Sequence, residues 1–143
     1  MATREHEKSP RVELFELIGT LARRRYQAAE RGYASLGLNH TEARLLKMLN
    51  EEGGAATQDA LSRRLTVDRS NAGRAFKRLE HAGYVGRRKD ATDNRTNLVD
   101  ITSEGRQAAA EVRRRGDDMA RSFFGDLSED DAATIVTLLH KAL

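Results

Sequence analysis

The 143-residue chain is 33% charged with a net charge of +3, and only 5% of it is aromatic, so we expect a single domain with a modest core. Its lack of Cys excludes disulfides, thiolate metal sites, a cysteine nucleophile and a thiol redox sensor. Because no apolar run approaches the roughly 20 residues that span a bilayer, and no signal-peptide pattern opens the chain, we predict a cytoplasmic protein with no membrane partner.

A long first helix is predicted over residues 10–36. Ser9 followed by Pro10 is a typical helix start. The apolar stripe that follows at helical spacing is Phe15, Ile18, Ala22, Tyr26, Ala29 and Tyr33. This stripe is broader than a lone surface helix needs, so we expect a partner chain to bury part of it. An alternative hypothesis is that Tyr26 and Tyr33 mark a small-molecule pocket, although aromatic residues at this spacing more often belong to a core.

Two shorter helices should follow. The first starts at Thr41 and ends at Gly53-Gly54, and Thr57 caps the second. His40 is predicted to be a water-exposed residue at a helix start. A metal site formed by His40 with Glu42 and Glu30 is the weaker hypothesis, because no two His residues lie three or four positions apart. We therefore predict no metal and no cofactor.

The stretch 66–83 is predicted to be the central functional helix. Asp68 lies at its N-cap position and Gly83 at a left-handed C-terminal position. Its apolar face consists of Ala72, Phe76 and Leu79. The opposite face collects residues that can bind base edges or phosphates in a DNA major groove: Ser70, Asn71, Arg74, Lys77, Arg78 and His81. The alternative is a surface helix with solvated charges.

Two features of the neighbouring sequence favour DNA. The basic helix directly follows a short helix and a tight turn, which is the helix-turn-helix pattern. Residues 57–95 also hold ten Lys/Arg against five Asp/Glu, and this local excess of positive charge is typical of a nucleic-acid contact surface.

A change of periodicity after Gly83 predicts a β-hairpin over residues 84–101. The segment YVGRRKD should form one strand, DATDNR the turn, and TNLVDIT the returning strand. Arg95 at the tip should lie over a flanking minor groove or phosphate, and Asp93 is close enough to bind turn amides or to orient Arg95. A basic hairpin behind a helix-turn-helix makes a winged helix.

Residues 103–143 should add two more helices. Thr102 caps the first, and Gly116 is a candidate kink within it. Ser128 with Asp131 resembles a capping box for the last helix, whose apolar residues can join the first helix in the base of a homodimer.

Several motifs in this order carry a family resemblance. They are LNHTEARLLKML, LSRRLTVDRSNAGRAFKRLEHAGYVGRR, the D-x-R motif at Asp93-Asn94-Arg95, and LVDITSEG. The sequence resembles the MarR (multiple antibiotic resistance regulator) family of bacterial winged helix-turn-helix transcription factors over about residues 12–143. It departs from the family pattern at Gly73, which costs a helix roughly 1 kcal/mol relative to Ala. It also lacks the reactive cysteine of the family's peroxide sensors, so that mechanism is excluded.

The resemblance implies an obligate homodimer on a pseudo-palindromic operator of double-stranded DNA, usually a repressor released by a small, here aromatic or phenolic, ligand. It places the recognition-helix roles on Arg69, Ser70, Asn71 and Arg74, and the minor-groove role on Arg95.

The sequence therefore predicts a mainly α fold with a small β-hairpin wing. One winged-helix domain should cover residues 1–143, with a DNA-binding lobe at 41–101, its wing at 84–101, and dimerisation helices at 10–36 and 103–143. The predicted function is sequence-specific DNA binding by a transcriptional regulator that is not an enzyme. The alternatives are an architectural or non-specific DNA-binding protein and a protein-interaction module.

Overall fold

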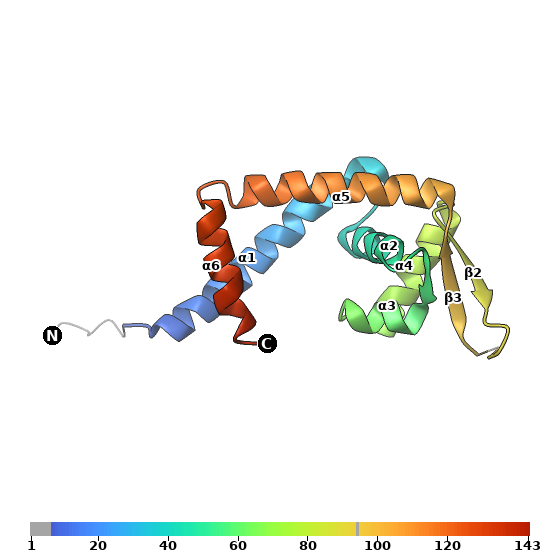
Figure 1. The fold of residues 1–143 in the computed structure, drawn as a ribbon, viewed down its shortest axis with the longest axis horizontal. Helices are drawn as coiled ribbons and strands as arrows, with labels where there is room; N and C mark the ends of the chain where they lie inside the picture. The colour runs from blue at the N-terminus through green and yellow to red at the C-terminus, as the bar shows by residue number, and fades with distance from the viewer. Residues whose placement is uncertain (1–6, 94) are drawn as a thin grey trace.

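The computed structural model describes residues 7–93 and 95–143, so Asn94 of the D-x-R motif lies outside the described residues. Figure 1 shows a compact lobe at one end of the molecule, helix α6 and the start of α1 at the other, and one long helix, α5, running between the two ends. The elements in order are α1 (Pro10–Tyr33), the 3-10 helix η1 (Ala34–Leu36), α2 (His40–Glu51), β1 (Ala55–Thr57), α3 (Gln58–Arg64), α4 (Arg69–His81), β2 (Val85–Lys89), β3 (Asn97–Ile101), α5 (Ser103–Phe123) and α6 (Glu129–His140). The predicted mainly α fold with a small wing is confirmed.

Side-chain caps set where the α-helices of the described chain begin. The capping residues are Ser9, Asn39, Thr57, Asp68, Thr102 and Ser128, and each accepts a hydrogen bond from an amide in the first turn. The capping box of Ser128 with Asp131 is also present. Only the start of α2 differs from the prediction. It begins at His40 rather than Thr41, because Asn39 Oδ1 accepts from the Glu42 amide at 2.8 Å.

The lobe packs α2, α3 and α4 against a three-stranded antiparallel sheet in the order β1-β3-β2. The largest fully buried side chains of the lobe are Phe76, Leu45, Leu46, Leu49, Leu61, Leu79 and Val99, and Val112 of α5 is buried in the same core. In the hairpin, Val85 pairs with Ile101 and Lys89 with Asn97. Strand β1 was not predicted; its three residues are too few to show a period, and they become a strand by pairing Ala56 with Val99.

The start of α5 is packed directly against the base of the hairpin. The Thr102 hydroxyl donates to the Gly83 carbonyl at 2.7 Å, and the Thr102 amide donates to the Tyr84 carbonyl at 3.0 Å. A Cβ on Gly105 would lie 2.0 Å from the Tyr84 carbonyl oxygen, a distance that no other residue type could accept. Glycine at this position therefore lets the long helix emerge straight from the lobe.

The other end of α5 lies along α1. The expected kink at Gly116 is wrong, because α5 continues through it as one helix (Figure 1). Gly116 instead makes room for a neighbour, since a Cβ there would lie 3.2 Å from the Tyr33 hydroxyl. A Cβ on Gly32 would likewise lie 2.4 Å from the Met119 sulfur. Small residues on both helices thus allow α1 and α5 to approach closely.

Two helix faces remain uncovered within this chain. The first half of α1 exposes Val12, Leu14, Phe15, Leu17 and Ile18, with Phe15 at 81%. Helix α6 has no buried residue and exposes Ile135, Val136, Leu138 and Leu139. In Figure 1, α6 and the start of α1 both lie toward the end of the molecule away from the lobe. This end of the molecule is consequently rich in exposed apolar surface.

Candidate nucleic-acid interface and adjoining cavity

Helix α4 is fixed by its apolar face and presents a polar face outward. The residues that anchor it in the core are Ala72, Ala75, Phe76 and Leu79. All six residues predicted on the opposite face are exposed: Ser70, Asn71, Arg74, Lys77, Arg78 and His81. The lobe thus presents on its surface the basic face that the sequence indicated.

A chain of hydrogen bonds orders the polar side chains at the start of α4. Asp68 accepts from the Asn71 amide through Oδ1 and from the Asn71 Nδ2 group through Oδ2, both at 2.8 Å. Asn71 in turn accepts through Oδ1 from Arg74 Nη2. Arg69 on the same turn lies 3.4 Å from Asp59 of α3, measured from Nη2 to Oδ2. Because Asp68 holds Asn71 and Asn71 holds Arg74, these side chains are oriented before any ligand arrives.

Arg78 differs from the other residues of this face because it has a buried partner. Its Nε donates to Glu42 Oε1 of α2 at 2.9 Å, and the Glu42 side chain is 6% exposed whereas that of Arg78 is 53% exposed. A buried carboxylate is costly unless it is paired, so the ion pair ties α4 to α2. Arg78 therefore has a structural task that the helical pattern did not indicate.

The hairpin tip is held by Asp93. Its carboxylate accepts from the Arg95 amide at 3.0 Å and from the Thr96 hydroxyl at 3.0 Å, which is the predicted contact with turn amides. The Arg95 residue itself is exposed. Along the strands, Arg88 Nε donates to Asp100 at 2.8 Å, and Arg87 pairs with Glu80 of α4 at 3.4 Å. The tip thus offers an exposed guanidinium on a well-anchored turn.

A cavity of about 530 Å³ lies between α1, α2 and α5, behind the basic face. Most of its lining is apolar, and Tyr33 lies in it. Tyr26 does not line it and is 54% exposed; its ring contacts the edge of His40, with the ring centres 5.6 Å apart. The structure therefore places the two tyrosines of the ligand hypothesis differently, one in the cavity wall and one outside it.

The polar groups of the cavity wall carry mostly positive charge. The cations of the wall are Arg25, Arg44 and Lys47, Asp117 is the acidic exception, and His40 is a further polar group. Burial, followed by the charges of Arg44 and Arg25, lowers the pKa of His40, while Glu30 opposes this shift. Burial also raises the pKa of Tyr33. A cavity with an apolar body and several cationic side chains suits an organic anion.

The expectation of a water-exposed His40 is wrong. The residue is partly buried as the first residue of α2, and its Nδ1 atom is buried without a hydrogen-bond partner. Neither carboxylate of the metal hypothesis is hydrogen-bonded to the imidazole ring, because Glu42 pairs with Arg78 and Glu30 accepts from the His40 backbone amide at 3.0 Å. Within residues 7–93 and 95–143, no group of three or more His, Asp or Glu could hold a metal ion.

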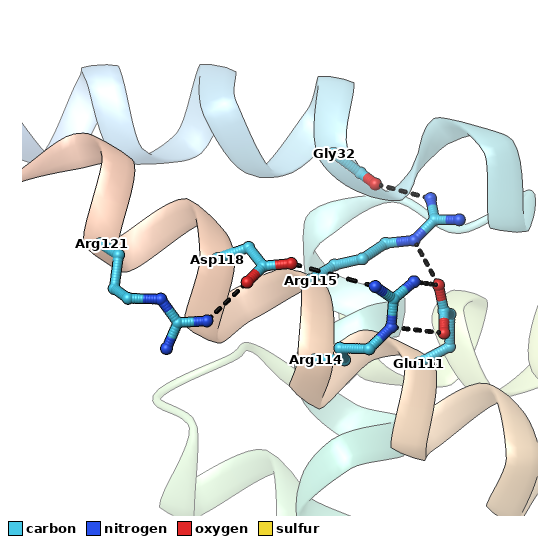
Figure 2. A network of polar contacts seen from close by, with 6 residues as sticks. All are labelled: Gly32, Glu111, Arg114, Arg115, Asp118 and Arg121. Carbon is cyan, nitrogen blue, oxygen red and sulfur yellow. Dashed lines mark hydrogen bonds and ion pairs between the residues drawn. The ribbon is translucent and has the colours of Figure 1, made fainter.

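A polar network ties α5 to the end of α1 beside this cavity. Figure 2 shows Glu111 between Arg114 and Arg115, with Arg114 continuing to Asp118. Hydrogen bonds from Arg114 and then Arg115 lower the pKa of Glu111 to about 2. Arg115 Nη1 also donates to the Gly32 carbonyl at 3.0 Å. The network thus fixes α5 against the last turn of α1.

Sequence reasoning missed the residues whose roles depend on distant partners. Glu42 and Arg78 are 36 positions apart, and Arg44 reaches the Leu65 carbonyl 21 positions away. The one available signal for Glu42 was its position at helical spacing from the apolar residues of α2. A carboxylate on that face becomes buried and therefore needs a charged or hydrogen-bonding partner. Among the described helices, none combines the length and the apolar character needed to cross a membrane.

Comparison with known proteins finds similarity to one family over the lobe. A family model described as the MarR family matches residues 38–96. The uncharacterized HTH-type transcriptional regulator YybA of Bacillus subtilis is 26% identical over 124 residues, which cover 87% of this chain and 82% of YybA. The HTH-type transcriptional regulator PapX of Escherichia coli is 34% identical over 74 residues, covering 51% of this chain but only 45% of PapX.

Solved structures extend the likeness to the whole chain. A mutant MarR from E. coli complexed with operator DNA superposes with a TM-score of 0.82 at 24% identity, covering 92% of this chain and 94% of that one. The PcaV transcriptional regulator from Streptomyces coelicolor, in complex with its natural ligand, gives a TM-score of 0.74 at 25% identity, covering 99% and 96%. The similarity thus includes α1, α5 and α6 as well as the lobe.

Proposed function

Because this chain belongs to the MarR family, we propose that it is a transcriptional regulator that binds a pseudo-palindromic DNA operator as a homodimer. The observation that carries the proposal is the exposed polar face of α4, which begins with the ordered series Asp68, Asn71 and Arg74. The superposable E. coli MarR was solved with operator DNA, which supports a DNA-binding role for the same lobe here.

The proposed contacts divide by chemistry. Ser70, Asn71 and Arg74 read base edges in the major groove, since Arg bonds bidentately to guanine and Asn to adenine. Arg69 and Lys77 contact phosphates and set the register without reading sequence. Arg95 enters the neighbouring minor groove from the hairpin tip, held there by the turn that Asp93 supports.

The proposed domain plan follows from the uncovered apolar faces. One winged-helix domain contains the DNA-binding lobe, about residues 41–101, and the segments 10–36 and 103–143 form the dimer base. Phe15 and Ile18 of α1 and Leu138 and Leu139 of α6 then bury each other or their copies across the two-fold axis. A soluble protein rarely leaves such an area open to water, which supports a second copy as its cover.

Regulation by a ligand is the last part of the proposal. An aromatic or phenolic acid enters the cavity between α1, α2 and α5, with Tyr33 beside it and Tyr26 acting through its contact with His40. Binding of the acid weakens the hold on the operator, so the protein acts as a repressor in the bacterial cytoplasm, where the chromosome lies. Its activity is binding alone, with no catalytic step.

The test begins by selecting binding sites from a random double-stranded library with the purified protein. We expect an enriched palindrome whose half-sites lie about 34–36 Å apart, one turn of DNA between centres. Excess random DNA should not remove the protein from this site. Failure to enrich any sequence, with equal competition by random DNA, would instead indicate a non-specific architectural protein.

Two matched variants of α4 then distinguish a residue that contacts base edges from one that contacts phosphates. Arg74→Ala should weaken operator binding by about 1–3 kcal/mol and affect random DNA much less. Lys77→Ala should weaken both DNAs about equally and reduce the slope of log affinity against log salt by about one unit. Equal effects of Arg74→Ala on both DNAs would contradict its assignment to a base.

A further inference from the structure

Arg44 contacts two places that the proposed function treats separately. Its side chain lies on α2 and forms part of the wall of the cavity between α1, α2 and α5. Its Nη2 group donates to the Leu65 carbonyl at 3.1 Å. Leu65 is the C-cap of α3, and α4 begins four residues later at Arg69. One guanidinium therefore links the cavity wall to the turn that sets the entry of the recognition helix.

The turn from α3 to α4 has a conformation that needs support. Thr66 has a φ of +53°, and it is the one non-glycine residue with positive φ in the described ranges, 7–93 and 95–143. This left-handed region is unfavourable for a β-branched residue. The Leu65 carbonyl lies at the end of α3, where carbonyls lack a partner in the helix. A charged donor at that carbonyl stabilises the turn from outside.

The charge around Arg44 favours an anion. Burial and then the nearby Arg25 lower the pKa of Arg44, so its positive charge is poorly compensated in this structure. Arg25 and Lys47 share the same wall, where Asp117 is the one carboxylate. A carboxylate accepts hydrogen bonds from a guanidinium more strongly than a backbone carbonyl does. An organic acid in the cavity therefore competes with Leu65 for the Arg44 side chain.

We propose that Arg44 is the positioning residue that couples the cavity to DNA binding, because an organic carboxylate draws its guanidinium away from the Leu65 carbonyl and frees the turn before α4. This inference rests on the proposed function, in which a ligand in the cavity weakens operator binding. It adds the residue that transmits the effect and its direction: the empty protein holds the recognition helix ready, and the anion loosens the start of that helix.

The test uses benzoate as the anionic probe, full-length protein and the selected operator. Three measurements are made on the wild type, Arg44→Met and Arg25→Met: benzoate affinity by calorimetry, operator affinity with and without saturating benzoate, and amide hydrogen exchange in residues 66–72. Arg25→Met is the matched control, since Arg25 lines the same cavity and Arg44, rather than Arg25, donates to Leu65.

For the wild type we expect benzoate to weaken operator binding by about 5- to 150-fold, the usual range of coupling between sites. It should also speed exchange of the Val67 amide, which donates to the Ser62 carbonyl at 2.9 Å in the closed turn. Arg44→Met should already bind the operator more weakly and exchange faster at Val67, with no further response to benzoate. Arg25→Met should bind benzoate less tightly but keep the full response at saturation.

The possible outcomes distinguish the inference from the function it rests on. If Arg44→Met binds the operator like the wild type and still responds to benzoate, the inference is overturned while ligand regulation stands. If benzoate leaves wild-type operator binding unchanged, both the inference and the ligand part of the function are overturned, while operator recognition stands. If Arg44→Met does not fold, Arg44→Lys decides. It keeps a cationic donor for Leu65 and should retain operator binding, and loss of binding in that folded variant would overturn the inference.

Discussion

At the scale of single residues, the outward face of α4 contains two kinds of cation. Lys77 is an exposed residue of the helix surface, whereas Arg78 is hydrogen-bonded to the buried carboxylate of Glu42. The sequence pattern places both on one face and cannot separate them, because the partner of Arg78 lies 36 positions earlier. Their substitution should therefore have different consequences for stability.

Arg78→Ala should lower the free energy of unfolding by about 1–3 kcal/mol, because it leaves Glu42 buried without a cation; the half-exposed position of Arg78 keeps the value below that of a fully buried pair. Lys77→Ala should change it by less than about 0.5 kcal/mol. Urea unfolding measures both. Combining Arg78→Ala with Glu42→Gln should recover part of the loss, and a double variant less stable than Arg78→Ala alone would argue against this pairing.

Substitutions of Arg95 and Asp93 in the wing should weaken operator binding for different reasons. Arg95→Ala is expected to weaken operator binding while leaving the melting temperature unchanged, because its side chain is exposed at the hairpin tip. Asp93→Ala should weaken binding too, but through the turn, since it removes the acceptor of the Arg95 amide and the Thr96 hydroxyl. Hydrogen exchange of the Arg95 and Thr96 amides distinguishes them: it should rise in Asp93→Ala only. A melting temperature lowered by Arg95→Ala would mean that Arg95 is structural.

His40 predicts a pH dependence of stability. Burial and the charges of Arg44 and Arg25 lower its pKa, so the unfolded chain takes up a proton at a higher pH than the folded chain does. Stability should consequently fall as the pH drops below the ordinary value of 6.5. Melting temperatures from pH 8 to pH 5 measure this fall, which should be shallower in His40→Gln. Parallel curves for the two proteins would show that His40 does not contribute.

At the scale of elements, the sequence carries most of the information for the helices and little for their contacts. Capping residues and apolar periods predicted five of the six helix starts among the described residues, and Gly83 has the left-handed φ of +83° that its position suggested. Strand β1 was missed because it exists only through pairing with β3. The pocket hypothesis named Tyr33, which lines the cavity, but not the residues of α2 and α5 that complete the wall, since no local pattern brings side chains of α1, α2 and α5 together.

The two glycines Gly73 and Gly105 illustrate how the same residue type differs with its element. A Cβ on Gly73 would meet Gln58 Nε2 at 3.6 Å, an ordinary contact, so Gly73→Ala should stabilise α4 by about 0.5–1 kcal/mol. Thermal unfolding should show a higher melting temperature. The control, Gly105→Ala, places its methyl group against the Tyr84 carbonyl and should destabilise strongly. If Gly73→Ala is stable yet binds the operator poorly, the glycine serves close approach of the backbone to DNA.

At the scale of the whole molecule, the lobe and the exposed apolar faces lie at opposite ends of α5 (Figure 1). The lobe shares one buried core with the end of α1 and the first half of α5, whereas α6 buries no residue within this chain. In the proposed function, assembly and DNA contact therefore belong to different ends of one chain, and a change at the assembly end should remove high-affinity DNA binding without unfolding the lobe.

Deletion of residues 128–143 should yield monomer or aggregate and abolish high-affinity operator binding. Leu138→Glu should have the same effect with less disturbance, because Leu138 is 54% exposed on the apolar side of α6. Thr137→Glu is the matched control, since it lies on the polar side of the same helix with Asp130, seven residues earlier. Light scattering and gel shifts measure the outcome. A truncated protein that stays dimeric and fully binds the operator would disprove this assignment.

The close packing of Gly105 on Tyr84 has a mechanical consequence. Because the joint leaves no space for a methyl group and Thr102 donates to the Gly83 and Tyr84 carbonyls, we expect the lobe to move together with α5 as one lever. Its 21 residues span about 30 Å, and a tilt of about 10° at the far end displaces the lobe by about 5 Å. That exceeds the spacing of about 3.4 Å between successive bases along a strand. The affinity for operators whose half-sites are moved apart by one base pair would thus report the angle between the two α5 helices of a dimer.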